Sequence, residues 1–194
     1  MKKMTKKEIF SIPNIMSYFR IILIPVFCVM YLKAETTTDY LLAALVVAIS
    51  SITDLFDGMV ARKFNMVTDL GKILDPVADK LSHAALAICL AIRYPLMWAL
   101  IGLMAVKEGY MAYMGLHYLK KGTMLNGAMW FGKICTASLF VGLLVLFIFP
   151  NLSIVAVNSI IVFLMVIMLI TFIMYIIEYG KIKKGQAGNE VEKL

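Results

Sequence analysis

Residues 152–179 read LSIVAVNSIIVFLMVIMLITFIMYIIEY, and Glu178 is their only charged residue. A helix needs about 20 mostly apolar residues to cross a lipid bilayer. The run is continuous and shows no alternation of apolar and polar residues, so it favours a helix over a strand. Because a backbone inside lipid must satisfy its own hydrogen bonds, we expect this segment to be a membrane-spanning helix.

The rest of the chain repeats this pattern. Of its 194 residues, 62% are hydrophobic and 16% are charged, whereas about 25% of the residues of a soluble domain are charged. We therefore predict an all-α integral membrane protein with six transmembrane helices and both termini in the cytoplasm. The other five predicted spans are residues 16–33, 39–59, 74–93, 95–116 and 128–149. A short interfacial helix is expected over residues 4–12, a single membrane domain over 1–184, and a disordered tail over 185–194.

The basic residues set the predicted orientation. One side of the membrane receives only Lys33 and Arg93, and the other receives the lysines of both termini and of the even-numbered loops. Basic loops face the cytoplasm. The net charge of +7 therefore reflects membrane topology, and we expect no nucleic-acid partner. The three cysteines each lie in an apolar run, which excludes a disulfide scaffold.

Chemistry is concentrated in residues 51–80, SITDLFDGMVARKFNMVTDLGKILDPVADK. Asp54 and Asp57 are three residues apart at the end of the second span, and Asp75 and Asp79 are four apart in the third. Either spacing places both carboxylates on one helix face. Because the connection between the spans is short, we expect antiparallel neighbours whose four carboxylates converge near the membrane surface.

Such a cluster needs cations, because like charges repel and charges near lipid are costly. Arg62, Lys72 and Lys80 can compensate part of the charge, and two divalent ions would compensate it better. Oxygen ligands favour Mg²⁺, Mn²⁺ or Ca²⁺. Two such ions suit in-line displacement at phosphorus.

Small residues accompany the acids and leave room for a substrate close to the backbone: Gly58, Ala61 and Gly71. Arg62 can pair with a phosphate in bidentate geometry. Pro76 is expected to bend the third span. A solvated loop with paired charges is the alternative interpretation, and the combination of four acids with three small residues argues against it.

The pattern Asp54-x2-Asp57-Gly58-x2-Ala61-Arg62-x8-Gly71-x3-Asp75-x3-Asp79 resembles the signature of the CDP-alcohol phosphotransferases. Ile12-Pro13-Asn14, followed by Arg20, resembles the bacterial phosphatidylglycerophosphate synthase branch of that family. The resemblance implies that an alcohol attacks the β-phosphorus of CDP-diacylglycerol and that CMP is released. It also implies a homodimer in the bacterial cytoplasmic membrane, with the active site facing the cytoplasm.

The same resemblance implies roles for the signature residues. Asp54, Asp57 and Asp75 would bind two Mg²⁺ or Mn²⁺ ions, and Asp79 would be the general base that can also touch the second ion. The CDP-donor pocket would be formed by Asp54, Gly58, Ala61, Arg62, Gly71 and Asp75.

The expected acceptor is glycerol 3-phosphate, whose phosphate would be bound by Arg20, Lys107 and Lys133. The chain departs from the branch pattern at Gly115 and Cys135, where basic residues are usual. Other acceptors therefore stay open: phosphatidylglycerol, which would give cardiolipin, serine and inositol phosphate.

Two of the acceptor residues have a second interpretation. Lys107 and Glu108 lie near the middle of the fourth span, where ionisable groups are usually functional. Since adjacent residues on a helix do not face each other, we expect Lys107 to face the site rather than to pair with Glu108. Lys133 either binds the acceptor or extends to lipid headgroups.

Two other classes of protein compete with an enzyme. A divalent-cation transporter or channel would use the acids as a binding site, but such sites usually lie near the bilayer midplane, often within repeats. The sequence shows no repeat. A structural membrane protein with a degenerate site would not be expected to keep all four aspartates.

Overall fold

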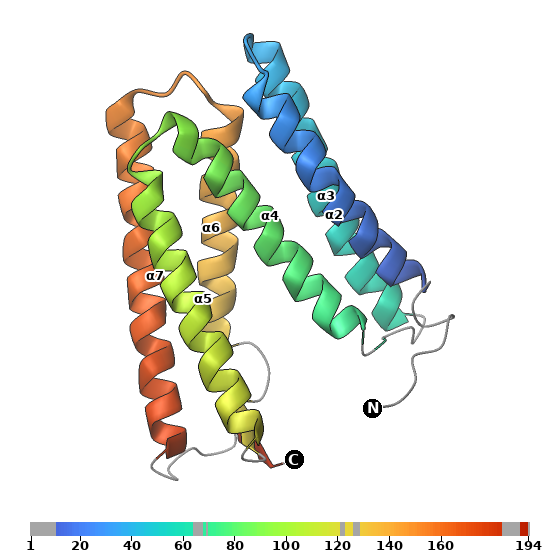
Figure 1. The fold of residues 1–194 in the computed structure, drawn as a ribbon, viewed down its shortest axis with the longest axis vertical. Coiled ribbons are helices and arrows are strands. Elements are labelled where there is room, and N and C mark those ends of the chain that lie inside the picture. Colours follow the sequence, from blue (N-terminus) through green and yellow to red (C-terminus); the bar gives the residue numbers. More distant parts are fainter. Residues whose placement is uncertain are drawn as a thin grey trace. The chain divides into compact units, whose positions relative to one another are not determined.

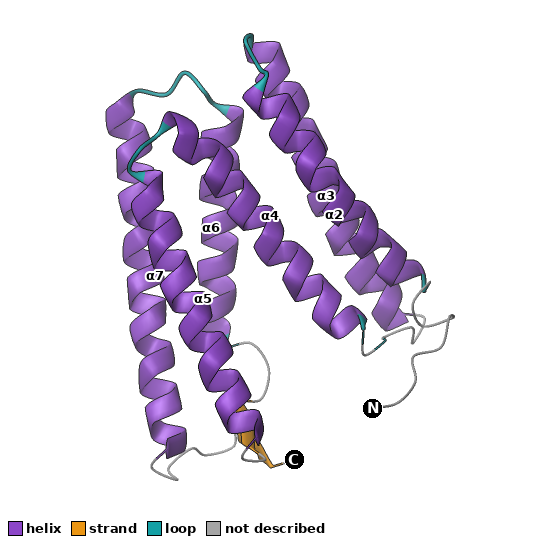
Figure 2. Ribbon diagram, viewed as in Figure 1, coloured by secondary structure: helices purple, strands orange, loops and turns teal. Residues whose placement is uncertain are grey.

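The computed structural model describes residues 11–63, 68, 70–120, 123–125, 129–183 and 191–193. Figures 1 and 2 show its helices and its two short strands. Each helix covers one of the six predicted apolar segments. The helices are α2 (Ile12–Leu32), α3 (Thr37–Lys63), α4 (Gly71–Arg93), α5 (Met97–Lys120), α6 (Trp130–Ile148) and α7 (Ile154–Lys183). The predicted interfacial helix, apart from its last two residues, lies outside the described part of the chain.

Three helical segments are long and apolar enough to cross a membrane: Asn14–Leu32, Trp130–Ile148 and Ile154–Lys181. The chain is therefore an integral membrane protein. In α3 the apolar part is shorter, Thr37–Thr53. The charges of Asp75, Asp79 and Lys80 lie within α4. The count of six spans stays a prediction.

The strands β1 (Thr123–Leu125) and β2 (Val191–Lys193) pair in antiparallel register, with Leu125 opposite Val191. The sequence predicts no strand, and it predicts a disordered tail over 185–194. For Val191–Lys193 the structure differs from that prediction. Such a short strand becomes recognisable only when a distant segment supplies its hydrogen bonds, and β1 is close to the end of α5.

The described chain forms two compact units. The first consists of Met1–Arg93 and Leu143–Asn151, and the second of Tyr94–Gly142 and Leu152–Leu194. In the first unit α2 makes close backbone contact with both α3 and α4, and in the second unit α5 makes close contact with α7. Within the described residues α3 and α4 make no contact of comparable extent. Direct packing of these two helices, which their short connection predicts, stays a prediction.

Aromatic residues fix the far half of α2. The ring of Tyr31 stacks on Phe147 with 4.2 Å between centroids, and Phe27 meets Phe147 edge to face at 6.1 Å. All three rings are buried. On the other side of α2, the buried face of α3 consists of small residues, Ala43, Ala44 and Val47, which allow close approach of the two backbones.

Phe147→Ala should remove about 3–5 kcal/mol of stability, because it leaves a cavity between two buried rings. Phe149→Ala is the matched control, since that side chain is 55% exposed. Thermal unfolding in detergent should show a lower midpoint for the first variant and little change for the second. Equal midpoints would contradict the packing of α2 described above.

Candidate active site

Three polar side chains of α2 are buried at a spacing of three residues: Asn14, Ser17 and Arg20. On a helix this spacing places them in one row. Most of α2 is apolar, so burying these groups would be costly without partners. We call these three residues the α2 polar row.

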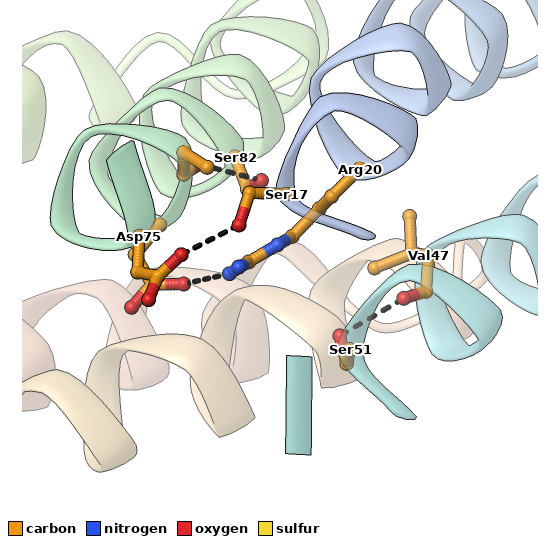
Figure 3. Close-up of polar contacts among 8 residues, drawn as sticks. Ser17, Arg20, Val47, Ser51, Asp75 and Ser82 are labelled. Carbon is orange, nitrogen blue, oxygen red and sulfur yellow. Dashed lines mark hydrogen bonds and ion pairs between the residues drawn. The ribbon is translucent and has the colours of Figure 1, made fainter. Parts of the chain in front are cut away.

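The partners of this row lie on α4. The Ser17 Oγ donates to Asp75 Oδ1 at 2.5 Å, and the Arg20 guanidinium forms a hydrogen-bonded ion pair with Asp79 Oδ1. Figure 3 shows Ser17 reaching Asp75 and Arg20 extending from α2 toward α4. The order of these contacts means that α2 and α4 run in the same direction. The contacting residues are three apart on α2 and four apart on α4. Side-chain rows with these two spacings fit between each other when two helices pack at a shallow angle.

The first member of the row binds the start of α4. Thr68 Oγ accepts the Gly71 N–H at 2.9 Å and donates to Asn14 Oδ1 at 3.2 Å. Thr68 therefore caps α4 and joins it to α2. A Cβ atom on Gly71 would lie 2.8 Å from Asn14 Oδ1, closer than real contacts allow. Any larger residue at this position would therefore have to displace the Asn14 side chain.

The ion pair is unequally exposed. The Arg20 side chain is 2% exposed and that of Asp79 is 45% exposed. The cation is thus enclosed while the carboxylate reaches the surface of the unit. Asp79 Oδ1 is engaged by Arg20, and Oδ2 has no hydrogen-bond partner among the described residues. Such a carboxylate can accept a proton or bind a cation through its second oxygen.

The donor set on α4 fits a hard divalent ion. Asp75 and Asp79 supply oxygen ligands one turn apart on a partly exposed face. Asp75 accepts from a neutral hydroxyl, the kind of contact that orients a metal-binding carboxylate. Asp79 Oδ1 instead contacts the Arg20 guanidinium, which leaves Oδ2 as the oxygen that can accept a proton or bind a cation. Among the described residues no three acidic, histidine or cysteine side chains come close enough to hold a metal.

The other half of the predicted site belongs to α3. The backbone of Asp54, Asp57, Gly58, Ala61 and Arg62 is helical, and their side chains lie outside the described part of the structure. The convergence of all four aspartates therefore stays a prediction. The helix continues through Pro76 in α4.

The predicted acceptor residues Lys107 and Lys133 belong to the second compact unit. Lys107 is buried, and its Nζ lies 2.9 Å from Glu108 Oε1. The expectation that these neighbours do not pair is wrong, because the long, flexible lysine side chain can turn back to the adjacent carboxylate. Lys133 is exposed in the first turn of α6. Arg20, the third predicted acceptor residue, contacts Asp79 as described above.

A cavity of about 420 Å³ lies at the opposite end of α2 and α4 from these carboxylates. Its lining includes Tyr31, Glu35, Tyr40, Arg93 and Asn151. None of the predicted site residues contributes to it.

Comparison with known proteins decides the family. The model of the CDP-alcohol phosphatidyltransferase family matches residues 10–177, which include α2, α3 and α4. The chain belongs to this family. It is an enzyme of the CDP-alcohol phosphatidyltransferase type, and a transporter, channel or purely structural role is excluded as its primary activity.

Individual relatives agree with the family assignment. The chain is 32% identical over 146 residues to CDP-diacylglycerol–glycerol-3-phosphate 3-phosphatidyltransferase of Escherichia coli K12, covering 74% of this chain and 80% of the relative. Relatives of the same name from Escherichia coli O157:H7 and Shigella flexneri serotype 5b match with the same identity and coverage.

Sequence reasoning missed Ser17 and the contact of Asn14. The available signal is the row itself, since three polar residues at a spacing of three interrupt an apolar helix. The sequence does not indicate which residues the α2 polar row contacts, because the register of α2 on α4 is a property of the packed unit.

Gly71→Ala should destabilise the first unit by about 1–3 kcal/mol, because the new methyl group pushes Asn14 away from Thr68. Gly102→Ala on α5 is the matched control, since an added Cβ there meets nothing within 4 Å. Thermal unfolding without substrate separates this packing effect from any loss of donor binding. An unchanged midpoint for Gly71→Ala would contradict the close approach of α2.

Proposed function

We propose that the enzyme transfers the phosphatidyl group of CDP-diacylglycerol to glycerol 3-phosphate, forming phosphatidylglycerophosphate and CMP. The identity of 32% over 74% of the chain to enzymes named for this reaction is the observation that carries the proposal. The partly exposed carboxylates of α4 support it, because they offer a base next to a metal ligand. The donor's acyl chains stay in the lipid while its headgroup reaches these residues.

The reaction is an in-line displacement. The acceptor hydroxyl gives its proton to Asp79 Oδ2, and its oxygen forms a bond to the β-phosphorus of the donor. The bond from that phosphorus to the CMP oxygen breaks, and CMP leaves with the electron pair. Two bound Mg²⁺ or Mn²⁺ ions would neutralise the diphosphate and stabilise the departing oxygen.

The signature residues divide this work. Asp54, Asp57 and Asp75 would hold the metal ions, and Asp79 could also contact the second one. The small residues let the diphosphate approach the α3 and α4 backbones. The donor pocket consists of Asp54, Gly58, Ala61, Arg62, Gly71 and Asp75.

We further propose the arrangement in the membrane: six spans in one domain over residues 1–184, both termini and the active site on the cytoplasmic side of a bacterial membrane, and a homodimer. The basic loops support this orientation. Lys107 and Lys133 are the candidates for binding the acceptor phosphate. Arg20, the third residue expected to bind it, is engaged by Asp79.

The residue at position 135 leaves the identity of the acceptor alcohol open. Cys135 stands where a basic residue is usual in this branch, and its side chain is 3% exposed. The site therefore has fewer cations for a dianionic phosphate. Phosphatidylglycerol, serine and inositol phosphate are the alternative acceptors.

CMP release by the purified protein should require CDP-diacylglycerol, Mg²⁺ and glycerol 3-phosphate together. Each alternative acceptor is added separately, with the lipid product identified by mass spectrometry. Excess EDTA should abolish release, and added Mn²⁺ should restore it. Stimulation only by another alcohol would overturn the acceptor assignment, and full activity in EDTA would overturn the metal mechanism.

Asp79→Asn should lower turnover to background, because the amide cannot accept the proton, while CDP-donor and metal binding stay largely intact. Asp39→Asn is a matched control, since Asp39 is an exposed acid in the first turn of α3. Turnover is measured by CMP release and binding by calorimetry with CDP. Full turnover in Asp79→Asn would remove Asp79 as the base.

A further inference from the structure

The ion pair between α2 and α4 has a role beyond compensating charge. We propose that Arg20 is a positioning residue that holds the carboxylate of Asp79 in the orientation from which it takes the acceptor's proton. This inference rests on the proposed role of Asp79 as the base. It replaces direct binding of the acceptor as the role of Arg20.

The geometry of the pair carries the argument. Arg20 is enclosed, and a guanidinium keeps its charge in proteins, so the side chain needs a permanent counter-charge. Asp79 Oδ1 supplies such a counter-charge. With Oδ1 engaged, the rotation of the carboxylate is restricted, and Oδ2 is the oxygen that accepts the proton in the proposed reaction. A base that must meet a hydroxyl at about 2.6–3.2 Å benefits from such a restraint.

Stability alone does not explain the pair. A buried ion pair typically stabilises a fold no better than well-packed apolar residues of similar size. A second contact between α2 and α4 has the same form, because the Ser17 hydroxyl donates to one oxygen of Asp75. Two successive carboxylates of α4 are thus each restrained through one oxygen by a single side chain of α2. The partner is neutral at the proposed metal ligand and cationic at the proposed base.

Arg20→Gln should lower kcat for CMP release by about 10–100-fold, the loss typical when the partner of an active-site ligand is removed. The KM values for CDP-diacylglycerol and glycerol 3-phosphate should change by less than about threefold, since a residue in the positioning role touches neither substrate. Arg20→Lys keeps the charge and should recover part of kcat. Arg93→Gln is the control, because this arginine lies at the other end of α4, 5.6 Å from the centre of the Tyr40 ring.

Unfolding in EDTA tests the pair without metal or substrate. Arg20→Gln and Asp79→Asn each remove this ion pair, so each should lower the melting temperature. The double variant should be more stable than the sum of the two losses predicts. Strict additivity would show that the two side chains are not coupled and would overturn the inference.

A second pair of variants keeps both charges and covers the case in which Arg20→Gln does not fold. Arg20→Lys shortens the cation and Asp79→Glu lengthens the acid. If Arg20 positions the Asp79 carboxylate, the two changes should partly compensate each other. The kcat of the double variant should then be at least about threefold higher than the value expected from multiplying the two single effects. Independent losses would overturn the inference.

The outcomes separate this inference from the proposed function. A rise in KM for glycerol 3-phosphate with unchanged kcat in Arg20→Gln would show that Arg20 binds the acceptor, which overturns the positioning role alone. Unchanged kcat and KM would also overturn it while leaving the transferase reaction intact. Full turnover in Asp79→Asn, in contrast, would remove the base on which both statements depend.

Discussion

The enclosed guanidinium of Arg20 constrains the first compact unit more than any other group. It is always charged, it lies in an apolar helix, and it finds its counter-charge on a helix that begins 39 residues after the end of its own. Meeting this requirement places α2 against α4, in the same direction and in one register. The contacts of Ser17 and Asn14 then follow, because they lie in the same row and meet Asp75 and the capped start of α4.

This arrangement gives the helices different tasks. The signature of the family lies on α3 and α4, and it supplies the acids and the small residues. Helix α2 supplies no acid, yet it contacts both carboxylates of α4 and approaches Gly71 through Asn14. A functional site of this kind depends on supporting side chains as much as on the groups that react.

The sequence predicted the helices well, because long apolar runs have one stable form in lipid. It also identified Asp75 and Asp79 as partners on one face. It did not predict that α2 lies against α4, since that register depends on which polar groups of distant segments meet. The pairing of Lys107 with Glu108 was missed because helix geometry alone underestimates the reach of a flexible side chain. The pairing of β2 with β1 was missed because neither segment has a strand pattern of its own.

The separation of the ion-pair partners along the chain affects how the protein is made. Arg20 and Asp79 are 59 residues apart, so the arginine leaves the ribosome first. At roughly 5–20 residues per second, several seconds of synthesis pass before its counter-charge exists. Throughout that interval Arg20 lacks the Asp79 carboxylate, and a charge within an apolar segment is costly in lipid. The contact that joins α2 to α4 therefore forms only after α4 has been synthesised, so the final packing of α2 depends on a helix made later in the chain.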